Sequence, residues 1–273
     1  MVDRARAKGT LILLGGNVTP TGEALCTFVR QAGAKNGAPI IGFTTASSDV
    51  AGSRDHWLQD FAKAGVTNCE IPIVETRKDA CDEKLGARIR EAKGIFLGGG
   101  DQVKLVSVLA GTPVEAAIRD AFMDGAVVCG TSAGAAALTK TTLAGNEVDE
   151  EGNLVAQYIG SGLGLLGFHT IVDTHFSQRR RLYRLFVAIA EYPELMGLGI
   201  DEDTAFCVEG EIATVFGAGG VTFVDASGVR FNNSADVERG RQLTISALRV
   251  GIIGSGQDFN LKKRELESLL PAS

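Results

Sequence analysis

The stretch AVVCGTSAGAAAL at residues 126–138 decides the fold prediction for this chain. An apolar run, Ala126–Cys129, is followed by the turn GTSAG and then by an alanine-rich helical start, Ala135–Leu138. This strand–turn–helix order is the context of a G-x-S-x-G elbow, in which the flanking glycines allow a sharp turn and leave the hydroxyl of Ser132 exposed. A helix that begins at Ser132 would also direct backbone N–H groups toward a developing oxyanion. A serine N-cap in a glycine-rich turn is the alternative interpretation, and the pentapeptide alone leaves both open.

Apolar runs like this one recur along the chain and alternate with helical patterns. Most runs are continuously apolar, as expected for strands covered on both faces in a parallel sheet. The expected strands are Thr10–Leu14, Pro39–Thr44, Glu70–Val74, Gly94–Leu97, Ala126–Cys129 and His169–Val172. The expected helices are Thr21–Ala34, Ser53–Ala64, Asp82–Ala92, Val103–Ala110, Val114–Asp124 and Gln178–Glu191. This alternation predicts an α/β fold with a doubly wound, mostly parallel sheet and right-handed crossovers.

The pattern changes after Ile200. The short apolar runs Ala205–Val208, Ile212–Phe216 and Val221–Val224 are separated by glycines, which predicts β-hairpins near the C-terminus. One more strand is expected at Val250–Ile253 and a closing helix at Leu261–Leu270. Because no repeat, low-complexity linker or shift in composition marks a boundary, we expect a single α/β domain over residues 1–273.

Composition excludes several classes of protein. Of the 273 residues, 45% are hydrophobic and 22% are charged, which is typical of a soluble globular protein. The net charge of 27 − 33 = −6 argues against a protein that mainly holds nucleic acid or an anionic membrane. Five widely spaced cysteines without a CxxC pair, and no apolar run long enough for a signal peptide or a membrane span, predict cytoplasmic residence. The chain has no HExxH or other metal-ligand spacing, so we expect no metal and no cofactor.

A serine nucleophile needs a base, and the chain has three histidines. His56 stands beside Trp57 in a helical pattern and His169 lies in a strand-like run, so both are interpreted as structural. His175 follows a predicted strand and precedes a helix, where a parallel strand would deliver it to the ligand-binding edge of the sheet. His175 is therefore the candidate base.

The order of the candidate residues along the chain excludes one superfold. No histidine follows His175, and the first acid-rich loop beyond it is the run Asp201-Glu202-Asp203. The order serine, histidine, acid differs from the serine, acid, histidine order of the α/β-hydrolases. The acidic loop follows the apolar stretch Leu195–Ile200, so one of its carboxylates is expected to orient the imidazole. The residues alone do not say which of the three it is.

A second glycine-rich turn, GGGDQ at residues 98–102, follows the predicted strand Gly94–Leu97. It has neither a GxGxxG pattern nor a Walker lysine, so it does not predict nucleotide binding. A tri-glycine turn beside the serine turn could supply a second oxyanion N–H, and a plain helix-start turn is the alternative. The glycine-rich segment Thr141–Gly167 is a candidate lid over the same edge.

Four arginines lie close after His175, at positions 179, 180, 181 and 184. Positive charge in the first turn of a helix opposes the helix dipole, so their placement indicates a nearby anionic group. That group is either an acidic substrate or a structural carboxylate, and arginine suits bidentate recognition of either one. Arg180 is interpreted as an ordinary solvent-exposed residue and is assigned no role in the site.

Four motifs in order resemble those of the cyanophycinases, which belong to the serine peptidase family that also contains peptidase E, an α-aspartyl dipeptidase. The motifs are GGGDQ at residues 98–102, GTSAGA at 130–135, DTHFSQRRRLYRL at 173–185 and GIDEDTA at 199–205. The resemblance covers about Thr10 to Val224. It implies a fold like that of class I glutamine amidotransferases, a homodimer, and hydrolysis of the aspartate backbone of cyanophycin to β-aspartyl-arginine dipeptides.

The resemblance also implies residue roles. Ser132 would be the nucleophile, His175 the base and Glu202 its acid partner. The oxyanion hole would be formed by Gly99 or Gly100 together with Ala133. The positions that match substrate-binding residues are Gln102, Asp173, Thr174, Arg179, Arg181 and Arg184.

One position departs from the pattern. Typical cyanophycinases carry Asp-Gln-His-Phe, whereas this chain has Thr174 in place of the glutamine. The change removes an amide that can both donate and accept hydrogen bonds beside the histidine. It leaves open a peptidase of the same family that acts on short aspartyl or acidic peptides. A member that binds acidic peptides without catalysis is the third alternative.

Overall fold

The computed structural model of the chain describes residues 9–148, 154–234 and 243–267. Its largest sheet has nine strands in the order β17-β16-β11-β10-β1-β5-β4-β2-β3. Neighbours among β3 (Cys69–Glu70), β2 (Ile40–Phe43), β4 (Gly94–Leu97), β5 (Val127–Thr131) and β1 (Leu11–Leu14) pair in parallel. The remaining strands, β10 (Thr204–Glu209), β11 (Ile212–Gly217), β16 (Asp258–Asn260) and β17 (Glu265–Leu266), extend the sheet in antiparallel pairs. All carboxyl ends of the parallel half thus lie along one edge.

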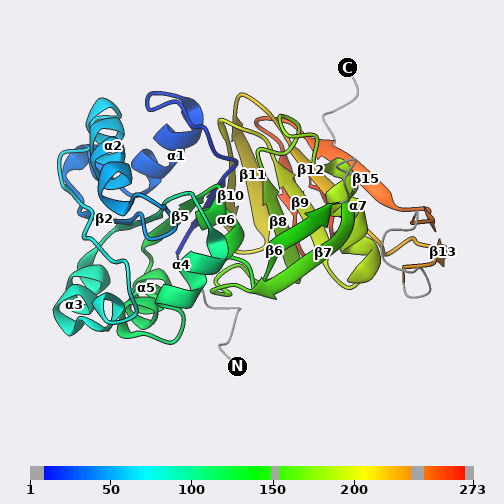
Figure 1. Cartoon of the computed structure of the whole chain (residues 1–273). Coiled ribbons are helices and arrows are strands. Elements are labelled where there is room, and N and C mark those ends of the chain that lie inside the picture. Colours follow the sequence, from blue (N-terminus) through cyan, green and yellow to red (C-terminus); the bar gives the residue numbers. More distant parts are fainter. Residues whose placement is uncertain (1–8, 149–153, 235–242, 268–273) are drawn as a thin grey trace, which may run out of the picture.

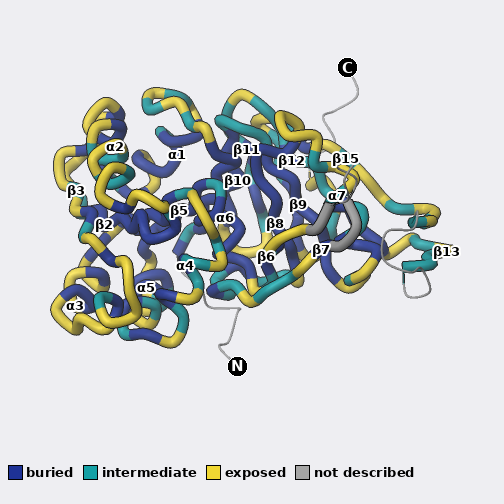
Figure 2. The backbone as a smooth tube through the Cα atoms, in the orientation of Figure 1, coloured by how far each residue is buried: buried dark blue, intermediate teal, exposed yellow. Residues whose placement is uncertain are grey.

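Helices cover both faces of the parallel half, so that all of its strands except the edge strand β3 are buried between layers (Figures 1 and 2). Alternate β1 side chains enter different cores: Ile12 and Leu14 pack with α1 (Glu23–Gln31) and α2 (Val50–Lys63), and Leu11 and Leu13 pack with the helices of the other face. The helices of that other face are α3 (Glu83–Glu91), α4 (Gln102–Leu109), α5 (Pro113–Met123) and α6 (Ala133–Ala137). Two short 3-10 turns, η2 (Ala34–Asn36) and η3 (Asp79–Cys81), complete this half.

A second sheet of four strands has the order β15-β12-β9-β8. Its strands are β15 (Arg249–Ile253), β12 (Val221–Asp225), β9 (Met196–Ile200) and β8 (Thr170–Thr174). Helix α7 (Leu182–Glu191) packs on it through Leu185 and Ile189. Two hairpins flank this sheet: β6 (Thr141–Val148) with β7 (Leu154–Ser161), and β13 (Phe231–Asn232) with β14 (Ile245–Ser246).

The α/β class and the parallel sheet are as expected from the sequence, with differences in detail. Of the runs expected to form hairpins, β10 and β11 pair with each other, but Val221–Val224 lies in β12, which pairs with β9 and β15 and not with β11. The strand expected at His169–Val172 forms as β8 but belongs to the second sheet, because its parallel partner is β9. The strand expected at Glu70–Val74 is reduced to Cys69–Glu70. Helix α7 begins at Leu182 and not at Gln178, so only Arg184 lies within its first turn, while Arg181 is its N-cap residue and Arg179 lies in the turn before it.

The helix expected at Leu261–Leu270 is wrong. Its first residues form a turn in which the Asn260 side chain accepts from the amides of Lys262 and Lys263. Arg264 then adopts a left-handed φ of 60°, which ends helical geometry, and Glu265–Leu266 pairs with β16 as strand β17. Residues 268–270 of the expected helix lie outside the described residues.

The candidate lid is a hairpin that is tied down at two points. The amide of Gln102 donates to the Leu143 carbonyl, and Arg119 Nη2 donates to the Leu163 carbonyl over 2.6 Å. Leu143 is buried, with 3% of its surface exposed. Residues 149–153, which join the two strands, lie outside the described residues. No helix within the described ranges is long and apolar enough to cross a membrane.

Candidate active site

Ser132 lies between strand β5 and helix α6, in a backbone conformation that few non-glycine residues adopt (φ 52°, ψ −117°). The glycines on either side make this turn possible. A Cβ on Gly130 would come within 2.4 Å of the Gly134 carbonyl oxygen, and one on Gly134 within 2.1 Å of the Leu97 carbonyl oxygen. The Ser132 amide donates to the Leu14 carbonyl over 3.0 Å, which fixes the turn at the carboxyl edge of the sheet.

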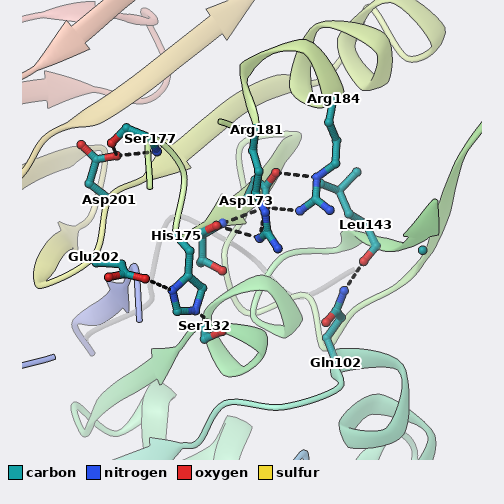
Figure 3. Close-up of polar contacts among 12 residues, drawn as sticks. Gln102, Ser132, Leu143, Asp173, His175, Ser177, Arg181, Arg184, Asp201 and Glu202 are labelled. Carbon is teal, nitrogen blue, oxygen red and sulfur yellow. Dashed lines mark hydrogen bonds and ion pairs between the residues drawn. The ribbon is translucent and has the colours of Figure 1, made fainter. Parts of the chain in front are cut away.

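His175 follows β8 directly and joins the second sheet to the first. Its amide donates to the Gly15 carbonyl over 2.8 Å, so the residue is held against the end of β1. Its imidazole packs on Gly16, where a Cβ would stand 2.3 Å from the ring. Nε2 of His175 lies 2.9 Å from Ser132 Oγ (Figure 3). A hydroxyl and an imidazole from different sheets are thus within hydrogen-bond reach, as a serine nucleophile and its base would need to be.

The three carboxylates of the acidic loop contact different partners. Glu202 Oε1 lies 2.7 Å from His175 Nδ1. Asp201 accepts from the Ser177 amide and the Gly220 amide, and Asp203 accepts from the Thr19 amide and hydroxyl. Of the three alternatives that the sequence leaves open, Glu202 is therefore the one in contact with the imidazole.

The protonation states of His175 and Glu202 suit a hydrogen bond between them at neutral pH. Burial lowers the pKa of His175, and Arg179 and Arg181 lower it further, while the hydrogen bond to Glu202 opposes the shift. The hydrogen bonds from His175 and from Asn17 lower the pKa of Glu202. A neutral His175 that donates its Nδ1–H to an ionised Glu202 leaves the Nε2 lone pair free to accept the Ser132 hydroxyl.

Three backbone amides of the serine turn and the tri-glycine turn have no acceptor among the described residues: those of Gly99, Gly100 and Ala133. A Cβ on Gly99 would stand 3.7 Å from Ser132 Oγ, so the tri-glycine turn passes beside the serine. Gly100 has φ +137° and packs on Ala46, whose carbonyl oxygen would lie 2.1 Å from a Cβ there. Free N–H groups beside a serine hydroxyl can stabilise a negatively charged oxygen.

Asp173 is the centre of the arginine cluster, with only 3% of its surface exposed. Its carboxylate accepts from Arg181 Nη1 over 2.9 Å and from Arg184 Nε over 2.8 Å (Figure 3). Arg179 is exposed and makes no ion pair within the described residues. Two guanidinium groups therefore share one buried carboxylate, which leaves an excess of positive charge around Asp173.

The remaining predicted positions lie around this cluster. Thr174 is buried, and its carbonyl accepts from Arg181 Nη1 over 2.7 Å. The side chain of Gln102 reaches the Leu143 carbonyl of strand β6 (Figure 3). Most of the predicted positions thus belong to two neighbouring groups, one around Ser132 and one around Asp173, while the side chain of Gln102 contacts strand β6.

Sequence reasoning missed two residues that hold Glu202. Asn17 Nδ2 donates to Glu202 Oε2 over 2.8 Å, and Gln178 Oε1 accepts from the Glu202 amide over 3.0 Å. Asn17 follows the glycine pair at the carboxyl end of β1, which is an edge where ligands bind in open α/β sheets. That position is the signal that could have drawn attention to it.

A serine, a histidine and a carboxylate linked by hydrogen bonds at this edge are typical of hydrolytic enzymes that work by acyl transfer. The model of peptidase family S51 matches residues 11–216, and the chain belongs to this family. It is therefore a peptidase, as the four motifs predicted.

Named relatives and a solved structure agree with the family assignment. The chain is 35% identical over 267 residues to a cyanophycinase of Synechococcus elongatus, covering 95% of this chain and 81% of that one. It is 36% identical to a cyanophycinase of Trichormus variabilis over 92% of this chain and 83% of that one. The fold is similar to that of a peptidase from an acI-B1 Actinobacterium, with a TM-score of 0.66, 20% identity, and coverage of 94% and 98% of the two chains.

Proposed function

We propose that this chain is a serine peptidase that hydrolyses the aspartate backbone of cyanophycin and releases β-aspartyl-arginine dipeptides. The proposal depends chiefly on one observation, the chain of contacts from Ser132 Oγ through His175 to Glu202 at 2.9 Å and 2.7 Å. The substrate is suggested by relatives that are named cyanophycinases and cover almost the whole chain.

In the proposed first half-reaction, Ser132 Oγ attacks the scissile carbonyl carbon while its proton moves to His175 Nε2. The carbonyl oxygen becomes an oxyanion, which the amides of Gly99 or Gly100 and of Ala133 stabilise. Glu202 stabilises the imidazolium across the 2.7 Å contact without taking the proton. When the tetrahedral intermediate collapses, the C–N bond breaks, the imidazolium protonates the leaving amine and the acyl group stays on Ser132.

The second half-reaction uses the same groups with water as the nucleophile. His175 Nε2 takes a proton from the water as its oxygen attacks the ester carbonyl. Collapse breaks the bond to Ser132 Oγ, and the imidazolium returns its proton to that oxygen. The products are a free carboxylate and the regenerated serine, so no cofactor is required.

The arginine cluster fits the proposed substrate. Cyanophycin exposes a free carboxylate on each arginine that it carries. We assign Arg179, Arg181 and Arg184 to these carboxylates, because guanidinium groups bind carboxylates in a bidentate manner. Asp173 would act indirectly by holding Arg181 and Arg184 in position. Gln102 and Thr174 would line the same region.

Thr174 favours a second candidate, a peptidase of this family that acts on short aspartyl or other acidic peptides. The hydroxyl of Thr174 can donate and accept, but its side chain is shorter than that of the glutamine in typical cyanophycinases and has one donor hydrogen where the amide has two. The chemistry would be the same, and only the preferred substrate would differ.

We also propose that the protein is a single-domain cytoplasmic homodimer. The exposed side chains of Val250 and Ile252, 46% and 73% accessible, lie on the edge strand β15 and would be a suitable contact. Sedimentation velocity tests the dimer, and a monomer at micromolar concentration would contradict it.

The substrate proposal is tested by incubating the purified protein with cyanophycin and measuring the release of β-aspartyl-arginine by mass spectrometry. Asp-X dipeptides are tested as alternative substrates in parallel, and the Ser132→Ala variant is the control. We expect release by the wild type only, because the variant has no hydroxyl to form an acyl-enzyme. Release by the variant at the wild-type rate would refute Ser132 as the nucleophile. Cleavage of the dipeptides alone would favour the second candidate.

A further inference from the structure

Glu202 has two carboxylate oxygens, and each of them has its own partner. Oε1 contacts His175 Nδ1 at 2.7 Å, and Oε2 accepts from the side-chain amide of Asn17 at 2.8 Å. A carboxylate held at both oxygens cannot rotate away from the imidazole without losing a charge-assisted hydrogen bond. The contact with Asn17 joins residues that are 185 positions apart in the chain.

Asn17 is itself held rigidly in the loop after β1. A Cβ on Gly15 would come within 1.8 Å of the Asp201 carbonyl oxygen, so this loop packs directly on the acidic loop. The Asp203 amide donates to the Gly16 carbonyl over 3.0 Å, which joins the two loops beside Asn17. Asn17 adopts a φ of 45°, a left-handed conformation in which asparagine is enriched.

We propose that Asn17 is a positioning residue of the active site: its amide fixes Glu202 in the orientation that supports His175. The inference rests on the proposed Ser132–His175–Glu202 machinery. The other titratable and charged groups that act on Glu202 are the His175 imidazole and the Arg179 guanidinium, so Asn17 is a neutral donor to the carboxylate oxygen that the imidazole does not contact.

The alternative is that Asn17 only forms the turn. The two roles separate in the Asn17→Gly variant, because glycine adopts φ 45° at no steric cost but has no amide side chain. If the turn were the whole role, Asn17→Gly would be as active as the wild type. The Asn17→Asp variant keeps the shape of the side chain and places a second carboxylate against Glu202, which raises the pKa of Glu202.

The test measures how fast Ser132 is labelled by a fluorophosphonate across a range of pH, together with kcat and KM for cyanophycin. For Asn17→Gly we expect labelling and kcat to fall about ten- to hundredfold, the effect of losing a charge-assisted hydrogen bond, with KM nearly unchanged. For Asn17→Asp we expect in addition that the acid limb of the labelling profile moves to higher pH, because Glu202 becomes protonated sooner.

Thr19→Ala is the matched control, since Thr19 lies in the same loop and its hydroxyl donates to the neighbouring Asp203 over 2.8 Å. We expect this variant to lose some stability but to keep the labelling profile of the wild type. The inference would be overturned if Ser132 were labelled as fast in Asn17→Gly as in the wild type. It would also be overturned if Asn17→Gly and Thr19→Ala slowed the labelling equally.

Failure of the proposed function gives a different result. If the wild-type Ser132 is not labelled at all, the nucleophile is wrong and the role of Asn17 is refuted with it. If the wild type is labelled but does not cleave cyanophycin, only the substrate is wrong. The labelling profiles of the variants then still decide the role of Asn17.

Discussion

At the scale of single residues, the site depends on a few positions with unusual backbone geometry. Ser132 and His175 both have positive φ values, 52° and 50°, so both side chains leave the main chain in directions that a regular strand or helix does not offer. Gly16 provides room for the imidazole, since any Cβ there would overlap the ring. Surrounding contacts must hold these conformations in place, because each is unfavourable alone.

The first prediction compares the three carboxylates of the acidic loop. Glu202→Gln removes the charge opposite His175, so kcat should fall by at least a hundredfold, about 2.7 kcal/mol of transition-state stabilisation, with a modest change in KM. Asp201→Asn keeps an acceptor for the Ser177 amide and should retain most of the activity. Steady-state kinetics on the two variants measures both kcat values. A larger loss of kcat in Asp201→Asn than in Glu202→Gln would show that Asp201, and not Glu202, supports His175.

The second prediction concerns pH. His175 must be neutral to accept the serine proton, so labelling of Ser132 should rise with pH through the His175 pKa, and the midpoint should lie below the ordinary value of about 6.5 because burial lowers that pKa. Arg179 lowers the pKa further, so Arg179→Gln should move the midpoint to higher pH. Arg180→Gln, the neighbouring exposed arginine, is the control. A midpoint that moves down in Arg179→Gln, or moves equally in both variants, would contradict this account.

At the scale of elements, the active site is assembled by the junctions between strands, turns and helices. Near the end of strand β8, Asp173 holds two arginines, one just before helix α7 and one in its first turn. Strand β9 ends before the acidic loop, and the Phe176 amide donates to the Ile200 carbonyl between them. The turn that carries His175 is therefore fixed on both sides before any substrate arrives.

The third prediction tests the junction at Asp173. Asp173→Asn leaves Arg181 and Arg184 partly buried without a counter-charge, so the free energy of unfolding should fall by about 3 kcal/mol. Urea denaturation measures it. Glu211→Gln is the matched control, because the pair of Glu211 with Lys262 is exposed and should change stability by less than about 1 kcal/mol. Equal stability of Asp173→Asn and the wild type would show that the cluster does not support the fold.

At the scale of the whole molecule, the second sheet is anchored at its far end by another buried carboxylate. Asp225 has none of its surface exposed and accepts from Arg249, Arg264 and the Ser227 hydroxyl. Burial raises its pKa, but the hydrogen bonds from Ser227 and Arg264 outweigh burial, so the pKa lies below its ordinary value. The other end of the same strand, β12, lies next to the acidic loop through the contact of Gly220 with Asp201.

The fourth prediction separates stability from catalysis at this anchor. Asp225→Asn should lower the free energy of unfolding at pH 7 by about 2–3 kcal/mol, while kcat stays unchanged. Because the folded pKa lies below the unfolded value of about 3.9, this stabilisation is complete above that pH and is lost as the pH falls through the folded pKa.

Urea denaturation at pH 7 and at a series of pH values below about 3.9 checks this, and the difference in stability between the two proteins should shrink as the pH falls. A difference in stability that grows as the pH falls would contradict a folded pKa of Asp225 that lies below the unfolded value. A loss of kcat in the folded variant would mean that the anchor also affects the site.

Local patterns in the sequence were sufficient to predict the α/β class, the parallel strands and the turn that presents Ser132. Continuous apolar runs and paired glycines act within a few residues, so their consequences can be read without knowledge of the rest of the chain. The order of Ser132, His175 and the acidic loop was equally visible, and so was the family resemblance that the match to family S51 confirmed.

Only the tertiary structure decided which carboxylate meets His175 and that Asn17 holds it. Those choices depend on β1 pairing with β10 and on β8 pairing with β9, which bring together loops far apart in sequence. The mistaken helix at Leu261–Leu270 has the same cause: pairing with β16 and a left-handed Arg264 outweighed local helical preference. Contacts across such separations depend on the whole packing, and no short stretch of sequence contains them.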